Sequence, residues 1–163
     1  MSNAIGSFKY WIPAISAAAI ISVFSTGAFG ENHTATYIIP ALHWLIPAAS
    51  PRLLHSLHTG IRKMAHIVEF SVFSILVFRA CRAGRQGWRP GWAVATLLIA
   101  VACASLDEIH QIFVPGRGPS VRDVAIDTFG ALLAQAMVWV YATGIWRRVA
   151  ISEEESRSPG QSA

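Results

Sequence analysis

Residues 128–146 read TFGALLAQAMVWVYATGIW, a run without a single Asp, Glu, Lys or Arg. Two similar charge-free runs precede it, residues 10–30 (YWIPAISAAAIISVFSTGAFG) and residues 90–106 (PGWAVATLLIAVACASL). Each run is close to the about 20 apolar residues that an α-helix needs to cross the hydrocarbon core of a bilayer. These runs predict an all-α protein that is embedded in a membrane.

The composition agrees with a membrane protein. Of the 163 residues, 53% are hydrophobic and only 13% are charged, whereas soluble domains average about 25% charged residues. Six tryptophans in so short a chain are typical of proteins that meet the membrane–water interface. The net charge of +4 does not predict a nucleic-acid partner, because the basic residues alternate with the apolar runs and are better explained by membrane topology.

We expect a bundle of four membrane-spanning helices, at residues 11–29, 64–80, 92–113 and 124–145. The second helix has the shortest charge-free stretch, so it must extend back through Glu69 and His66 to reach spanning length. The first helix also fits a cleaved signal peptide, although its length favours an uncleaved span.

Basic residues set the expected orientation. Arg79, Arg82, Arg85 and Arg89 follow the second span, Arg147 and Arg148 follow the fourth, and Lys9 precedes the first. By the positive-inside rule, both termini of this multi-pass protein lie in the cytoplasm. The transmembrane domain then covers residues 10–148, between a cytoplasmic segment, 1–9, and a cytoplasmic tail, 149–163, whose composition predicts disorder.

The segment between the first two spans contains Pro40, Pro47 and Pro51 and therefore cannot be one continuous helix. In residues 52–63, apolar side chains recur at helical spacing and polar side chains occupy the other side. This pattern predicts an interfacial amphipathic helix on the outer face of the membrane. A membrane-resting loop without function and a lipid-recognition element both fit it.

Ionisable residues gather at one membrane level, because the start of the second span, the end of the third and the start of the fourth all face outward in this topology. Such side chains at bilayer depth indicate a functional site, since they are costly unless they face a bundle interior, a partner or water. Structural roles stay open for two of them, a helix cap for Asp123 and a loop contact for Arg117. The candidate polar pocket consists of His66, Glu69, Asp107, Glu108, His110, Gln111, Arg117, Asp123 and Asp127.

The chemistry of this pocket favours an anionic ligand. Arg117, Arg122 and His66, with the N–H groups at the start of the fourth span, suit a lipid phosphate or a lipid-linked precursor. The spacing matches no metal signature, and motifs such as Gly-x-Ser-x-Gly and His-Glu-x-x-His are absent, so we expect no metal and no cofactor. A proton-relay transporter is less favoured, because the polar residues stop at the outer half of the helices.

Two blocks of sequence are distinctive. The first is KMAH at residues 63–66, followed by Glu69 and Phe70; the second is DEIHQIFVPGR at residues 107–117, followed by Asp123, Asp127 and Gly130. With the spans, these blocks resemble the VanZ-like family of bacterial integral membrane proteins, named after the teicoplanin-resistance protein VanZ. The chain departs from the family pattern at Asp127, where asparagine is usual, and at Ala134, where a second glycine is common.

The resemblance implies a cell-envelope protein of the bacterial inner (cytoplasmic) membrane, with glycopeptide (teicoplanin) resistance as the role of some members and no settled reaction. The leading hypothesis is recognition of an anionic envelope lipid or a lipid-linked glycan precursor. Two alternatives stay open, a hydrolase or transferase that acts on a lipid phosphate through His66 or His110, and a non-catalytic assembly subunit. The sequence makes no prediction of the oligomeric state.

Overall fold

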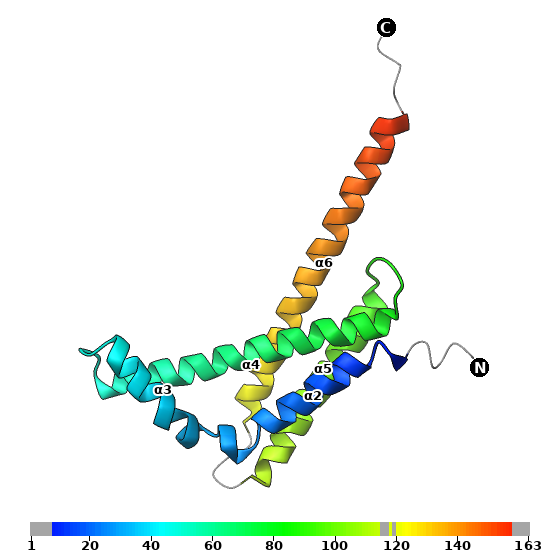
Figure 1. Cartoon of the computed structure of the whole chain (residues 1–163). Coiled ribbons are helices and arrows are strands. Elements are labelled where there is room, and N and C mark those ends of the chain that lie inside the picture. Colours follow the sequence, from blue (N-terminus) through cyan, green and yellow to red (C-terminus); the bar gives the residue numbers. More distant parts are fainter. Residues whose placement is uncertain (1–7, 115–117, 119, 158–163) are drawn as a thin grey trace.

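The structure is a computed structural model that describes the backbone of residues 8–114, 118 and 120–157, with side chains as far as residue 144. The described residues form helices joined by turns, with no strand among them (Figure 1). The elements are α2 (Ile12–Phe24), the 3-10 helix η1 (Gly27–Phe29), α3 (Glu31–Leu45), α4 (Pro51–Arg82), α5 (Pro90–Ile112) and α6 (Val121–Arg157). The prediction of an all-α membrane bundle is confirmed.

Helix α4 is the central element of the bundle. It contacts α2, α3, α5 and α6, and Figure 1 shows the middle of α4 crossing the N-terminal half of α6. Three helices have the length and apolar character of membrane spans, namely α4, α5, and α6 as far as Gly144. Their shared core combines aromatic and aliphatic side chains with alanines, which let helices approach closely within a bilayer. It contains Ile21, Phe70, Phe73, Val77, Ala100, Ala104 and Ala131.

The crossing of α4 and α6 depends on a glycine and on buried hydrogen bonds. A Cβ atom at Gly130 would lie 2.5 Å from the carbonyl oxygen of Ile67, so only glycine allows the two backbones to lie this close. One turn further along α4, the Ser71 hydroxyl donates to the Gly130 carbonyl at 2.8 Å. The amide of Gln135 donates to the Ser74 hydroxyl at 2.9 Å. Small residues and interhelical hydrogen bonds of this kind hold helices together in lipid.

The first predicted span is not a single helix. Helix α2 ends at Phe24, Thr26 is extended, and the chain bends by 71° between α2 and the segment that contains η1 and α3. Because α2 has 13 residues and a span needs about 20, the described residues contain three helices long and apolar enough to cross a membrane, or four spans if the bent pair crosses as one. Two side-chain hydroxyl groups form hydrogen bonds at the break. Thr26 donates to the backbone carbonyl of Val23, and Ser25 donates to the side chain of Asp107 in α5.

Two helices extend beyond their predicted boundaries. Helix α4 is continuous over 32 residues, so the amphipathic residues 52–63 are its first turns rather than a separate helix. It begins after Ser50, whose hydroxyl accepts from the N–H of Leu53, and the expected interruption before it is present at residues 46–50. Helix α6 continues to Arg157, contrary to a disordered tail from residue 149, because no Gly or Pro interrupts the sequence there.

Candidate functional site

A histidine and an aspartate join α4 to α6 at the centre of the site. The Nδ1 atom of His66 lies 3.1 Å from the Oδ1 atom of Asp127. Asp127 is fully buried, whereas the His66 side chain keeps 21% of its surface exposed. The pair forms one turn before Gly130, where α6 approaches the α4 backbone most closely. The Asp127 carboxylate therefore holds the Nδ1 side of the imidazole, and the ring also lines a cavity beside α4.

A second carboxylate ties the broken first helix to α5. The Oδ2 atom of Asp107 accepts a hydrogen bond from the Ser25 hydroxyl at 2.6 Å and another from the Gln111 amide at 2.9 Å. All three residues are buried. Since Ser25 is the C-cap residue directly after α2, this contact anchors the bend between α2 and α3 against α5.

A third carboxylate holds the start of α6. Glu108 accepts a hydrogen bond from the backbone N–H of Ser120, the residue that precedes the helix. The Ser120 hydroxyl in turn accepts from the N–H of Asp123 at 3.3 Å, as a helix-capping serine does. Asp123 itself is half-buried. Ser120 and Glu108 therefore supply the acceptors at the start of α6, where the sequence predicted a cap by Asp123.

The three buried carboxylates each retain one oxygen atom without a partner among the described residues. These atoms are Oδ1 of Asp107, Oε1 of Glu108 and Oδ2 of Asp127. The carboxylates lie close enough for their charges to interact, and Asp123 adds a further charge to the group. Buried acceptors without donors are costly, so this acidic cluster lowers the stability of the folded protein.

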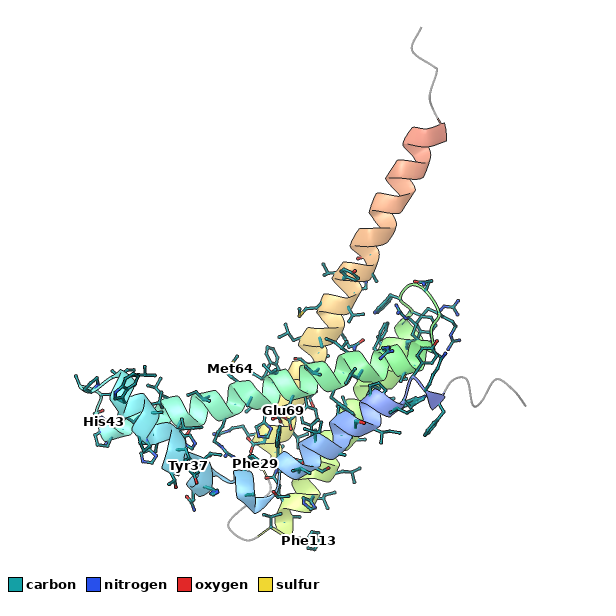
Figure 2. All side chains as sticks on the ribbon, viewed as in Figure 1. Phe29, Tyr37, His43, Met64, Glu69 and Phe113 are labelled. Carbon is teal, nitrogen blue, oxygen red and sulfur yellow. The ribbon has the colours of Figure 1, made fainter. Side chains whose placement is uncertain are left out.

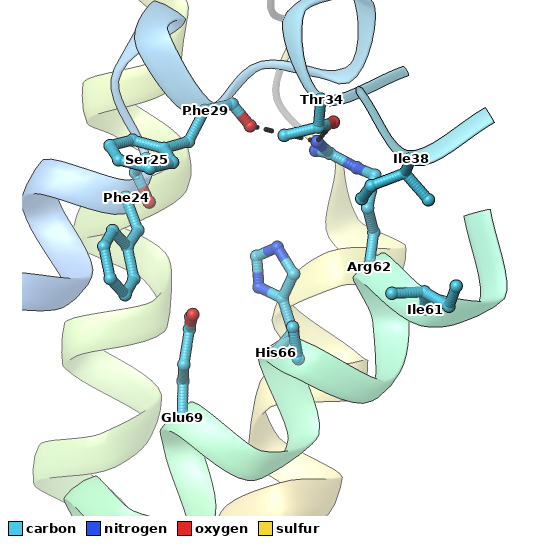
Figure 3. Close-up of a pocket in the computed structure, with 10 residues that line it drawn as sticks. Phe24, Ser25, Phe29, Thr34, Ile38, Ile61, Arg62, His66 and Glu69 are labelled. Atoms are coloured by element: carbon cyan, nitrogen blue, oxygen red, sulfur yellow. Dashed lines mark hydrogen bonds between the residues drawn. The ribbon is translucent and has the colours of Figure 1, made fainter. Parts of the chain in front are cut away.

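A cavity of about 230 Å³ opens between α2, α3 and α4, next to His66. Figure 3 shows His66 and Glu69 projecting from α4 into it, with Phe24 and Phe29 opposite. Arg62 closes one side, where its Nη1 atom donates to the Phe29 carbonyl at 3.0 Å and to the Thr34 hydroxyl at 3.1 Å. The lining combines apolar walls with basic, acidic and hydroxyl groups, namely Phe24, Ser25, Phe29, Thr34, Ile38, Ile61, Arg62, Ala65, His66 and Glu69.

Figure 2 places this cavity within the whole molecule. Glu69 lies near the middle of the molecule, and Met64 projects from the opposite side of α4. Tyr37 and His43 lie on α3, which packs against the start of α4, and Phe113 lies beyond the end of α5. The cavity is therefore at the junction of the bent α2–α3 segment with the three-helix core.

The comparison with known families identifies the chain. A family model described as VanZ/LLP1 matches residues 10–143, which include every residue of the candidate site described above. The chain belongs to the VanZ/LLP1 family. No curated protein and no solved structure matches it. With its membrane-length helices, this VanZ/LLP1 protein is a multi-pass membrane protein.

The VanZ/LLP1 structure brings several of the predicted pocket residues together and leaves others apart. His66 pairs with Asp127, Asp107 with Gln111, and Glu69 lines the cavity beside the first pair. His110, in contrast, is exposed on the outer side of α5. Arg117 lies outside the described residues, so its predicted contact with an acid stays a prediction.

Sequence reasoning missed three residues of this VanZ/LLP1 site. Ser25 is hidden within an apolar run, and only its tertiary bond to Asp107 reveals its position. Thr34 lies in the segment whose helices could not be predicted across the prolines. Arg62 lies within residues 52–63, which were predicted as an interfacial amphipathic helix and not as part of the pocket, although it precedes His66 by four residues and thus shares its helix face.

No group of three or more His, Cys, Asp or Glu side chains among the described residues has the geometry to hold a metal ion. The carboxylates around Asp107 and Asp127 take their partners from serine, glutamine and histidine instead. Both cysteines are unpaired and half-buried. The His66–Asp127 pair, beside a cavity with polar lining, can bind a polar group and transfer a proton.

Proposed function

We propose that this VanZ/LLP1 protein binds the anionic headgroup of an envelope lipid or a lipid-linked glycan precursor in the cavity between α2, α3 and α4. The cavity lies at the outer face of the bacterial inner membrane, with both termini in the cytoplasm. When the protein holds such a lipid, it changes the membrane surface that glycopeptides such as teicoplanin meet. The observation that carries the proposal is the position of Arg62 at the rim of an apolar-walled cavity.

Arg62 supports an anionic ligand because its charge is not neutralised within the described residues. Its two hydrogen bonds go to a backbone carbonyl and a hydroxyl, which are neutral acceptors. No carboxylate oxygen of the described residues lies within ion-pair distance of it. A guanidinium group that is held in place and still carries its full charge is well suited to bind a phosphate.

The size and walls of the cavity favour a lipid over a free solute. Its volume of about 230 Å³ is below the roughly 300–1,000 Å³ of sites that enclose a drug-sized molecule. Only a headgroup fits, and the acyl chains of the ligand stay in the bilayer. Phe24, Phe29 and Ile61 supply the apolar boundary at which such a headgroup meets its chains.

The His66–Asp127 pair favours a second candidate function, a hydrolase or transferase that acts on the phosphate of the bound lipid. A buried carboxylate that holds an imidazole at 3.1 Å sets the orientation of the ring, and the ring faces the same cavity as Arg62. In this function His66 acts as general acid or base, and Arg62 stabilises negative charge on the phosphate.

Binding and turnover are measured on the purified full chain in phosphatidylcholine nanodiscs. Phosphatidylglycerol and a polyprenyl phosphate are the probes, and release of inorganic phosphate or glycerol phosphate reports turnover. We expect saturable binding of both probes, weakened about tenfold in Arg62→Gln, as loss of a charge-assisted hydrogen bond predicts. The control is Lys63→Gln, which removes the same charge from the neighbouring residue, outside this cavity.

Each outcome separates the candidate functions. Binding without turnover supports recognition, and turnover that is lost in His66→Gln supports the enzyme. Equal losses in Arg62→Gln and Lys63→Gln contradict the cavity, and absence of binding and turnover supports an assembly subunit. The role in resistance is tested by expressing the protein in a teicoplanin-susceptible bacterium, where we expect a higher inhibitory concentration for the wild type than for Arg62→Gln.

A further inference from the structure

A second groove lies between the C-terminal half of α4 and α6, at the opposite end of the bundle from the candidate site. It encloses about 410 Å³ on the side where Figure 1 shows the two helices diverging after their crossing. Five of its lining side chains are apolar or aromatic and two are arginines. The lining consists of Ile75, Phe78, Arg79, Arg82, Met137, Val138 and Tyr141.

Arg82, which lines this groove, has a hydrogen-bond donor without an acceptor among the described residues. Its Nε atom is buried and has no hydrogen-bond acceptor among the described residues. A buried guanidinium donor without an acceptor is costly, so the site is incomplete without an anion or another acceptor. Arg79 lies three residues earlier on the same face of α4 and is exposed, so both charges reach one ligand.

The surroundings of the groove are basic. The sequence has no Asp or Glu from residue 70 to residue 106, which covers the end of α4, the connection and most of α5. The other two arginines of the connection are engaged elsewhere, because Arg85 and Arg89 stack over the Trp92 ring at 4.9 Å and 5.1 Å. Arg79 and Arg82, in the last turn of α4, are therefore the two arginines that line the groove.

We infer that this groove binds one anionic phospholipid from the leaflet next to the α4–α5 connection. Its phosphate lies against Arg82 and Arg79, and one acyl chain follows Phe78, Met137 and Val138 towards the bilayer centre. Basic pockets between membrane helices bind anionic headgroups in this manner, since the charge and the apolar walls complement both parts of one lipid. The site is separate from the cavity of the proposed function and does not depend on it.

Native mass spectrometry of the full chain tests the site by counting lipids retained after release from detergent. Phosphatidylglycerol, phosphatidylcholine and free glycerol phosphate are the probes. We expect retention of phosphatidylglycerol alone, reduced about tenfold in Arg82→Gln and unchanged in Arg89→Gln, which removes the same charge from the same end of the molecule. The outer cavity of the proposed function also takes phosphatidylglycerol, so Arg62→Gln should remove one retained lipid and leave the lipid that depends on Arg82, which separates the two sites.

A second variant keeps the test decisive if Arg82→Gln fails to fold. Met137→Trp fills the apolar part of the groove without changing the charge, and we expect it to reduce retention of phosphatidylglycerol as well. Equal losses in Arg82→Gln and Arg89→Gln, full retention in Met137→Trp, or equal retention of phosphatidylcholine overturns the inference. Competition by glycerol phosphate at the same concentration as the lipid also overturns it, because the apolar walls would then contribute nothing.

Discussion

Replacing Gly130 with alanine tests the contact that holds α4 against α6. The added Cβ atom would lie 2.5 Å from the carbonyl oxygen, 3.0 Å from the Cα atom and 3.1 Å from the carbonyl carbon of Ile67. All three atoms are backbone, so relief requires the helices to separate. Overpacking of this kind costs about 1–3 kcal/mol, while alanine in a helix recovers at most about 1 kcal/mol relative to glycine. We therefore expect a net loss of stability.

The assay is thermal unfolding in detergent, followed by tryptophan fluorescence, with Gly144→Ala as the matched control. Gly144 lies in the same helix, and a Cβ atom there meets nothing within 4 Å. The control should be as stable as the wild type or more stable, because it gains only helix propensity. Separation of the helices also lengthens the His66–Asp127 contact, so lipid binding should fall in Gly130→Ala. Equal stability of the two alanine variants would refute the reasoning.

Three further predictions concern Ser25, Asp127 and Arg117. Ser25→Ala removes one of the two donors to Asp107, and we expect a loss of about 1–3 kcal/mol in unfolding free energy; Ser16→Ala, on the exposed side of the same helix, should lose nothing. Asp127→Asn keeps an acceptor for its histidine partner and should melt as the wild type does, whereas Asp127→Leu should melt lower. Arg117→Ala should weaken phosphatidylglycerol binding while expression and insertion stay normal. Unchanged binding would show that Arg117 does not contribute to binding of the headgroup.

Much of the fold follows from local sequence. The charge-free runs identify α5 and α6, and the helical spacing of residues 52–63 identifies the first part of α4, because hydrophobic period and span length are local properties. The end of α2 was not predictable in the same way. Ser25 and Thr26 lie within an apolar run, and the helix ends there through a contact with Asp107, a residue 82 positions away.

The candidate site, like the fold, was predictable from the sequence only in part. Antiparallel topology predicted the shared membrane level of His66 and Asp127, and these residues form the central pair. The spacing of four residues between Arg62 and His66 was available in the sequence. The role of Arg62 required the bend of α2 into α3, since that bend supplies the Phe29 carbonyl that holds it. Tertiary contacts across a broken helix carry no local signal, so the cavity could not be predicted.

Photo-crosslinking with a headgroup-labelled diazirine phosphatidylglycerol tests the outer cavity most directly. The purified protein is irradiated in phosphatidylcholine nanodiscs and the labelled peptides are identified by mass spectrometry. We expect label on the segments 24–38 and 61–69, which contain the residues that line the cavity, separate from any label at the groove between α4 and α6, and we expect it to fall in Arg62→Gln but not in Lys63→Gln. Labels spread evenly along the lipid-facing sides of α4, α5 and α6, with no effect of Arg62→Gln, would contradict it.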